Sequence, residues 1–367
     1  MLGFNLRQLL AAFGFATILL YGLGAGLTCS LSLETAPAAA KEGGNVPGNW
    51  SGNVGDAEFW RAVRKGGQGT ISIPDKKAAT LVQSHGEEFR VLRNGPLSQI
   101  GVWMLLASVI VISLFFAIRG KIRVESGMSG QTIERFNDFE RAVHWLTASS
   151  FMVLAVTGLN ILYGKYFLPA LIGQSAFSTL TMYGKSAHNY IAFSFIIGIG
   201  LMFVMWVKDN IFDKYDLKWL AVAGGFFSRG LHPPARRFNF GQKSIFWAVM
   251  IGGGSLVLSG LSLLFPFEIP LFAGTFTILN FLGFDLPTDL TALQETQLAV
   301  LWHSLMALVM TSIIIAHIYI GSLGMEGAIC AVSTGKVDLN WAREHHNLWV
   351  EEVESEGDNK AANQPAE

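Results

Sequence analysis

The sequence predicts an all-α membrane protein built on a four-helix transmembrane core. Of its 367 residues, 51% are hydrophobic and only 14% are charged, whereas soluble domains carry about 25% charged residues. In addition, uncharged runs recur at about the 20-residue length that crosses a bilayer as a helix. The formal net charge of −1 gives no indication of a nucleic-acid partner.

The uncharged runs define the expected spans. They lie at about 8–31, 100–118, 145–163, 189–207, 244–266 and 298–323. The last four form the expected core, and the first two add one or two N-terminal transmembrane helices. A stretch at about 270–284 is shorter and begins at a proline, so we interpret it as an interfacial or re-entrant segment.

The N-terminal run leaves two alternatives open. It follows a short basic start, and the small residues Ala38 and Ala40 fit a secretory cleavage site. Residues 1–40 are therefore either a signal peptide or an N-terminal anchor helix. We expect the rest to divide into an extracytoplasmic segment (41–98), an extra transmembrane helix (99–120), the four-helix core (121–330) and a C-terminal tail (331–367).

The distribution of Lys and Arg predicts the orientation. Segments 119–141 and 208–243 are rich in both, whereas 164–187 contains only Lys165 and Lys185, and 267–297 contains neither. Because short basic loops face the cytoplasm, we expect a multi-pass protein of the bacterial inner membrane with a cytoplasmic C-terminus. The segment 41–98 then lies outside.

Four histidines are expected at membrane depth. His303 and His317 lie 14 residues apart in LWHSLMALVMTSIIIAHIYIGS, which is about 21 Å along a helix and about 40° short of four full turns. They therefore face the same side at two depths. His188 begins its run at the outer face, like His303, and His144 begins its run at the inner face, like His317.

An imidazole in hydrocarbon is costly and indicates function. Two histidines from separate helices, one on each side of a flat macrocycle, are typical of bis-imidazole haem ligation. The two pairs therefore predict two haem b groups, stacked as a path for electrons across the bilayer. For a single histidine, the alternative is an interfacial hydrogen bond.

Other metal centres and other classes of protein fit the sequence less well. Zinc requires four ligands in one place, and these pairs lie too far apart. Cys29 and Cys330 form no CxxC or CxxCH motif, which disfavours c-type haem and iron–sulfur ligation. A transporter or a haem-free anchor remains an alternative that would show no redox signal, although the spans lack the acidic residues of a proton-coupled carrier.

The remaining polar candidates are weaker. Asn239, Gly241 and Gln242 in ARRFNFGQKSIF are candidate contacts to a quinone head group, and helix capping is the alternative. His85, His232, His345 and His346 lie in polar segments, so we expect surface or capping roles for them.

Several motifs carry a resemblance to a known family. They are RFNDFERAVHW (135–145), GKSAHNYIAF (184–193), RRFNFGQKSIFW (236–247), LWHSLMAL (301–308), IIAHIYIGS (314–322) and WAREHHNLW (341–349). From about 133 to 350 the chain resembles the gamma, cytochrome b subunit of respiratory formate dehydrogenases. Single motifs also occur in the cytochrome b subunits of nickel–iron hydrogenases, which leaves those, or another respiratory oxidoreductase, as the alternative.

The resemblance implies a di-haem core that passes electrons to membrane quinone. By position, His188 and His303 would bind the outer haem iron, and His144 and His317 the inner one. Asn239 and Gly241 match the quinone loop of the family, with His317 beside the quinone. The implied partners are an iron–sulfur beta subunit and a molybdopterin (molybdenum or tungsten) alpha subunit that oxidises formate, while this chain performs no formate chemistry itself.

Overall fold

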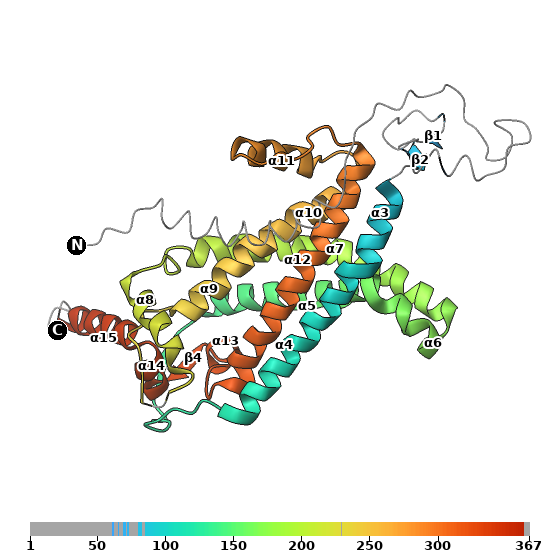
Figure 1. Ribbon diagram of the computed structural model, residues 1–367. Coiled ribbons are helices and arrows are strands. Elements are labelled where there is room, and N and C mark those ends of the chain that lie inside the picture. The colour runs from blue at the N-terminus through green and yellow to red at the C-terminus, as the bar shows by residue number, and fades with distance from the viewer. Residues whose placement is uncertain are drawn as a thin grey trace, which may run out of the picture. The chain divides into compact units, whose positions relative to one another are not determined.

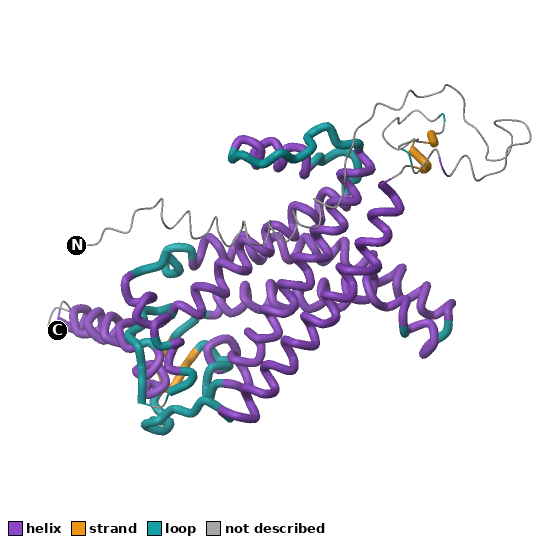
Figure 2. Tube along the Cα trace, in the orientation of Figure 1, coloured by secondary structure: helices purple, strands orange, loops and turns teal. Residues whose placement is uncertain are grey.

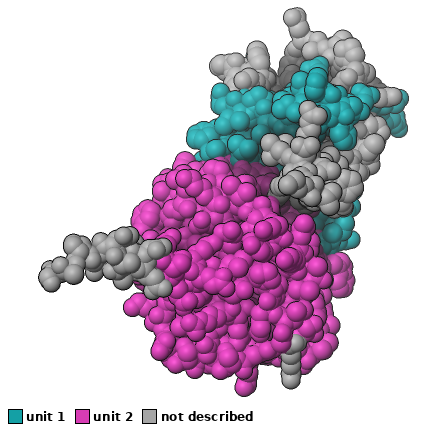
Figure 3. Space-filling model, turned by 90° about the vertical axis from the view of Figure 1, so that its left-hand side faces the viewer, with its two compact units in different colours: residues 1–100, 258–303 teal, residues 101–257, 304–367 magenta. Residues whose placement is uncertain are grey.

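The computed structural model describes residues 61, 65, 69–70, 72, 80–82, 85–228 and 230–362. The expected N-terminal run, residues 1–40 and most of the segment 41–98 lie outside the described residues. The chain divides into two compact units (Figure 3). Unit 1 comprises residues 1–100 and 258–303, and unit 2 comprises residues 101–257 and 304–367.

Five helices in the described part of the chain are long and apolar enough to cross a membrane (Figure 1). They are Gly86–Arg119, Asp138–Tyr166, Gln174–Trp206, Phe240–Leu264 and Ala292–Gly324. Each covers all or nearly all of one of the expected runs after residue 98, which confirms the four core spans and one additional N-terminal span. The protein is therefore a multi-pass membrane protein.

The spans expose apolar side chains where a soluble protein would expose polar ones. Trp103, Val111 and Ile118 on helix α4 (Ser98–Arg119) are 71%, 63% and 86% exposed. Exposed apolar surface on this scale marks a face that contacts lipid or protein. Because a helix satisfies its own backbone hydrogen bonds, such a face is stable in hydrocarbon.

Unit 1 contains short elements around the ends of longer helices. They are β1 (Gly69–Thr70), β2 (Thr80–Val82), α3 (His85–Leu92), a π-helical turn (Arg93–Leu97), α11 (Leu271–Phe281) and parts of α4, α10 (Gly254–Leu264) and α12 (Ala292–Tyr319). Helix α11 follows Pro270 and has 11 residues, too few to span a bilayer. The Glu295 carboxylate caps it by accepting hydrogen bonds from the backbone N–H groups of Phe272 (2.8 Å) and Ala273 (2.7 Å).

Unit 2 contains the rest of α4, α10 and α12. Its other elements are β3 (Thr132–Glu134), α5 (Asp138–Tyr163), α6 (Leu168–Ile172), α7 (Gln174–Trp206), α8 (Lys214–Ala221), α9 (Phe240–Ala248), α13 (Cys330–Ser333), β4 (Lys336–Asp338), α14 (Leu339–His345) and α15 (Asn347–Ala362). A π-helical turn, Val249–Gly253, joins α9 to α10.

Helices α5 and α7 form the closest helix pair of unit 2. A capping box starts α5: the Asn137 side chain accepts from the Glu140 backbone N–H, and the Glu140 carboxylate accepts from the Asn137 N–H. Farther along, a Cβ atom on Gly198 of α7 would collide with Thr147 of α5. The glycine therefore lets the two backbones approach closely.

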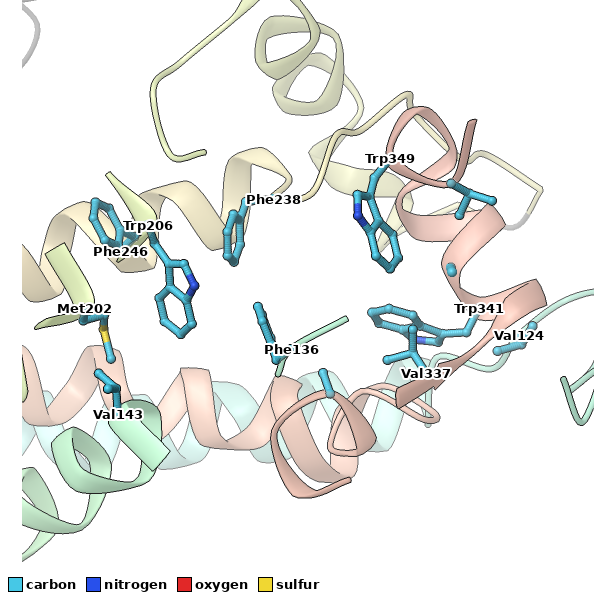
Figure 4. Packing of buried hydrophobic residues seen from close by; sticks show 13 residues of the cluster. Val124, Phe136, Val143, Met202, Trp206, Phe238, Phe246, Val337, Trp341 and Trp349 are labelled. Atoms are coloured by element: carbon cyan, nitrogen blue, oxygen red, sulfur yellow. The ribbon is translucent and has the colours of Figure 1, made fainter. Parts of the chain in front are cut away.

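Strands β3 and β4 and helices α14 and α15 pack together in unit 2, and we call this part of the unit the cap. Strands β3 and β4 pair antiparallel, with Ile133 opposite Val337, and these short ladders are the β elements that the all-α expectation did not include (Figure 2). Buried aromatic residues fill the cap, among them Phe136, Trp341 and Trp349 (Figure 4). The C-terminal tail thereby packs against the loops that begin α5 and α9.

Candidate functional site: four histidines within the spans

His144 and His317 lie close together in unit 2. His144 belongs to α5 and His317 to α12, and their ring centroids are 6.5 Å apart with the planes inclined at 55°. Two opposite metal–nitrogen bonds of about 2 Å, with half an imidazole ring beyond each, amount to roughly 6 Å between centroids. The separation therefore fits two imidazoles on opposite sides of one iron.

The polar atoms of this pair also fit a ligand role. The buried Nδ1 atom of His144 has no hydrogen-bond partner among the described residues. A buried polar atom without a partner is costly and calls for an explanation. Metal binding supplies one, because a neutral imidazole uses one nitrogen as the ligand while the other carries a proton.

His188 on α7 contacts α5 within unit 2. Its Nδ1 atom lies 2.9 Å from the Thr157 hydroxyl, and that hydroxyl donates to the Val153 carbonyl at 2.7 Å. The next residue, Gly158, faces the ring edge: a Cβ atom there would lie 3.4 Å from His188 Cε1. The imidazole is therefore oriented by a hydroxyl and packed against a glycine.

His303 on α12 has equivalent surroundings in unit 1. Its Nδ1 atom lies 3.0 Å from the hydroxyl of Ser259, which is fully buried on α10. The next residue, Gly260, faces the ring edge, since a Cβ atom there would lie 3.3 Å from His303 Cε1. Hydroxyl and glycine thus occupy the same two places beside His303 as beside His188.

The other histidines differ from these four. His232 lies partly exposed, 3.3 Å from the Glu125 carboxylate. The expected surface position is wrong for His346, whose side chain is fully buried, but the residue does cap a helix, as the C-cap of α14. Its Nδ1 atom donates to the Arg236 carbonyl at 2.8 Å, since a carbonyl only accepts. Burial holds the pKa of His346 well below its ordinary value, and burial also lowers the pKa of His345 to about 4.

A buried arginine supports the loop that carries the quinone candidates. Arg135 is 3% exposed and donates to the Arg237 carbonyl at 2.6 Å, with His346 Nε2 at 3.1 Å. The indole of Trp349 stacks under its guanidinium, 5.1 Å from the ring centroid. Burial, followed by the charge of Arg237, lowers the pKa of Arg135 to about 9.

The quinone candidates lie at the start of α9. Asn239 is the N-cap, and its side chain accepts from the Gln242 N–H at 3.0 Å while the Gln242 side chain accepts from the Asn239 N–H at 3.2 Å. The side-chain oxygens of Asn239 and Gln242 thus both take part in helix capping, the alternative role expected for these residues. Gly241 packs against Trp219: a Cβ atom on Gly241 would lie 3.0 Å from the Trp219 ring.

A pocket in unit 2 lies beside this capping box. Its volume is about 40 Å³, and its lining includes Asn239, Arg119, Glu125, His232 and His345. That space holds roughly three water molecules. The loop that carries Asn239 therefore borders a space large enough for water and lined in part by titratable side chains.

Sequence reasoning missed the parts of the site that depend on contacts distant in sequence. In the sequence Arg135 is one of several positive charges in the segment 119–141, and Thr157 and Ser259 are hydroxyl residues within apolar runs. The sequence did carry one usable signal, because a hydroxyl residue directly precedes a glycine at 157–158 and again at 259–260.

Comparison with known proteins agrees with the architecture. The model of the prokaryotic cytochrome b561 family matches residues 135–328, more than half of the chain. The matched region contains His144, His188, His303 and His317.

Individual relatives have low sequence identity to the chain, but the matches cover most of their length. The chain is 27% identical over 231 residues to the formate dehydrogenase cytochrome b556(fdo) subunit of Escherichia coli K12, covering 63% of this chain and 97% of that protein. It is 26% identical over 224 residues to the nitrate-inducible cytochrome b556(Fdn) subunit of the same organism, covering 60% and 92%. For the formate dehydrogenase cytochrome b556 subunit of Haemophilus influenzae the values are 22% over 214 residues, covering 58% and 79%. From the family match and the membrane-spanning helices together, the chain belongs to the prokaryotic cytochrome b561 family, whose members are membrane proteins that carry haem b.

Proposed function

We propose that this chain is the membrane-anchoring cytochrome b subunit of a formate dehydrogenase. It passes electrons from an iron–sulfur beta subunit through two b haems to membrane quinone. The observation that supports this most directly is the 6.5 Å approach of His144 and His317 on two membrane-spanning helices. The relatives reported above are all formate dehydrogenase subunits, which favours this function over the hydrogenase alternative.

His144 and His317 hold the inner haem in this proposal, and His188 and His303 hold the outer one. For the inner site the support is the centroid separation and the unpartnered Nδ1 of His144. For the outer site the support is the matching hydroxyl contact that each histidine makes within its own unit. Haem b, when bound, supplies a carrier that accepts and releases one electron at a time.

The residues of the chain orient the ligands and exclude water. Gly158 and Gly260 leave room at the edges of the His188 and His303 rings. The apolar side chains of the spans keep the ligand nitrogens in a medium of low dielectric constant. In such a medium a neutral imidazole is favoured over a charged one, and neutral imidazole is the form that binds iron.

Quinone reduction is placed at the start of α9. Asn239, Gly241 and Gln242, with His317, are the proposed contacts. Reduction of one quinone to quinol consumes two electrons and two protons. The pocket beside Asn239 contains Glu125, His232 and His345 in its lining, so water and titratable groups are available there as a source of the protons.

The proposed orientation follows the basic loops. Segments 119–141 and 208–243 face the cytoplasm, as does the C-terminus, in the bacterial inner membrane. The pocket beside Asn239 then draws protons from the cytoplasmic side. The iron–sulfur beta subunit meets the opposite end, and the molybdopterin alpha subunit, which oxidises formate, delivers electrons to it.

The test uses the complex purified from membranes in detergent. Formate should reduce b-type absorption bands, and subsequent addition of menadione should reoxidise them. Complex containing His85→Ala serves as the histidine control and should behave like the wild type, since His85, at the start of α3, is not among the proposed haem or quinone contacts. If formate leaves the b-type bands unchanged in the intact complex while hydrogen reduces them, the formate assignment is wrong.

A further inference from the structure

The histidines assigned to the outer haem share one local arrangement. A hydroxyl residue and the glycine that follows it face each ring: Thr157–Gly158 beside His188, and Ser259–Gly260 beside His303. We call each pair a hydroxyl–glycine step. One step lies in unit 2 and the other in unit 1. The same chemistry was thus built twice, on two different helices.

Two groups on α5 face the His188 ring as acceptors, the backbone carbonyl of Leu154 and the hydroxyl of Thr157. A hydroxyl has one proton to donate, and the Thr157 hydroxyl has the Val153 carbonyl at 2.7 Å, a group that can only accept. Toward His188 Nδ1, 2.9 Å away, the hydroxyl oxygen therefore accepts. Nδ1 then carries the proton, and Nε2 carries the lone pair that would bind the iron of a haem.

Ser259 gives His303 the same partner at the same ring atom. Its hydroxyl lies 3.0 Å from Nδ1 and is fully buried, so water does not compete for the contact. Gly260 restricts the rotation of the His303 ring, because a Cβ atom on Gly260 would lie only 3.3 Å from His303 Cε1. Partner and clearance together hold the ring in one orientation.

A hydrogen bond accepted from Nδ1–H makes an imidazole a stronger donor to its metal. A stronger donor favours the ferric over the ferrous state and lowers the reduction potential of a haem. The inner pair differs, because the rings of His144 and His317 make no hydrogen bond to any described residue. The two pairs therefore give their haems unequal electron donation.

We propose that Thr157 and Ser259 are positioning residues, each of which fixes the ligand tautomer of its own histidine, His188 or His303, and lowers the reduction potential of the haem that this histidine binds. This rests on the proposed function, since it requires that haem to be present. It assigns the outer haem the lower potential and the inner haem the higher one. Electrons entering at the outer face then run downhill toward the quinone.

The test is a redox titration of the haem absorption bands in the purified complex, with variants at Thr157. Thr157→Val keeps the shape of the side chain and removes the hydroxyl acceptor while the Leu154 carbonyl remains, whereas Thr157→Ser keeps the hydroxyl. In Thr157→Val we expect the equilibrium constant for reduction of one haem to increase about tenfold, which is ~59 mV for one electron. Thr157→Ser should titrate like the wild type, and Ser259→Ala should raise the potential of the same haem.

Thr147→Val is the matched control on the same helix. Thr147 is buried on α5 and donates to Val143 as Thr157 donates to Val153, and among the described residues it makes no hydrogen bond to a histidine. It should leave both potentials unchanged. Electron paramagnetic resonance of the oxidised complex provides a second measurement, since the low-spin signal of one haem should shift in Thr157→Val and return in Thr157→Ser.

The outcomes separate the inference from the function. Loss of one haem in Thr157→Val, with retention in Thr157→Ser, also supports the positioning role. The inference is overturned if Thr157→Val keeps both haems with unchanged potentials and unchanged spectra. It is also overturned if Thr157→Ser changes the potential or the haem content as much as Thr157→Val does. A wild-type complex without b haem would instead overturn the proposed function itself.

Discussion

His144 on α5 and His317 on α12 face each other with 6.5 Å between their ring centroids. They are separated by 173 positions along the chain, so their approach is a product of the tertiary fold. The capping box at Asn137 starts α5 two turns before His144. It therefore fixes the position of His144 along the helix axis. Two imidazoles at this separation suit one iron between them.

Removing one imidazole of this pair should remove one haem. In His317→Ala we expect the haem content to fall from two per chain to one, because a single histidine leaves the other axial position without a protein ligand. The haem held by His188 and His303 should remain. Pyridine haemochrome analysis of the purified complex gives the count. His232→Ala should retain both haems, and a count of two in His317→Ala would contradict the assignment.

The clearance at Gly260 should be measurable with matched glycine variants. In Gly260→Ala the new methyl would lie 3.3 Å from His303 Cε1, so the ring must move by a few tenths of an ångström. Gly254 is also on α10 but has no heavy atom within 4 Å of the place of its Cβ. We expect Gly260→Ala to shift the low-spin resonance of one haem and Gly254→Ala to leave it unchanged. Equal spectra for the two variants would contradict the packing argument.

Arg135 should contribute strongly to the stability of the protein, because its buried side chain has partners on three other segments. Arg135→Ala leaves the Arg237 carbonyl and His346 Nε2 without their donor and opens a cavity among aromatic rings. We expect a loss of about 2–4 kcal/mol and an apparent Tm lower by about 5 °C or more, measured by circular dichroism. Arg343→Ala is the control, because the Arg343–Glu354 ion pair is half exposed and such pairs contribute little. Equal Tm values would show that the buried arginine is not needed for the cap.

Acidification should destabilise the cap through His345 and His346. Burial lowers the pKa of His345 to about 4 and that of His346 further below the ordinary value of 6.5. Between about pH 6.5 and 4 the unfolded chain therefore binds more protons than the folded chain, and stability falls as the pH falls. The carboxylates Asp338 and Glu344, whose pKa values are lowered by hydrogen bonds that outweigh burial, add to this loss only below about pH 4.5.

The measurement is the apparent Tm of the complex between pH 7 and pH 4. In the wild type it should decline as the pH falls below about 6.5. His345→Gln removes one titrating ring and should make this decline shallower, while the carboxylate contribution at lower pH remains. A decline of the same steepness in His345→Gln would show that other groups cause the acid sensitivity.

Much of the transmembrane architecture could be predicted because it depends on local properties. Uncharged runs of about 20 residues locate the spans, and the 14-residue separation of His303 and His317 predicts one face at two depths. Helix α11 was also anticipated as too short to cross, since Pro270 and the later loop limit its length. These inferences need only helix geometry and the cost of polar groups in hydrocarbon.

The cap and the hydroxyl contacts could not be predicted in the same way. His346 lies in the polar segment AREHHNLW, and its burial comes from Arg135, 211 positions away. Strands β3 and β4 have three residues each, too short for an alternating pattern to identify. Thr157 and Ser259 look like ordinary helix residues until the neighbouring helix brings a histidine to them.

The central claim is that imidazoles from separate helices hold two haems within this chain. The most direct test is quantitative electron paramagnetic resonance of the oxidised wild-type complex, combined with the haem-to-chain ratio. We expect two haem b per chain, both low-spin with the signals of two imidazole ligands. One haem or none per chain, or a high-spin signal from either haem, would contradict the account.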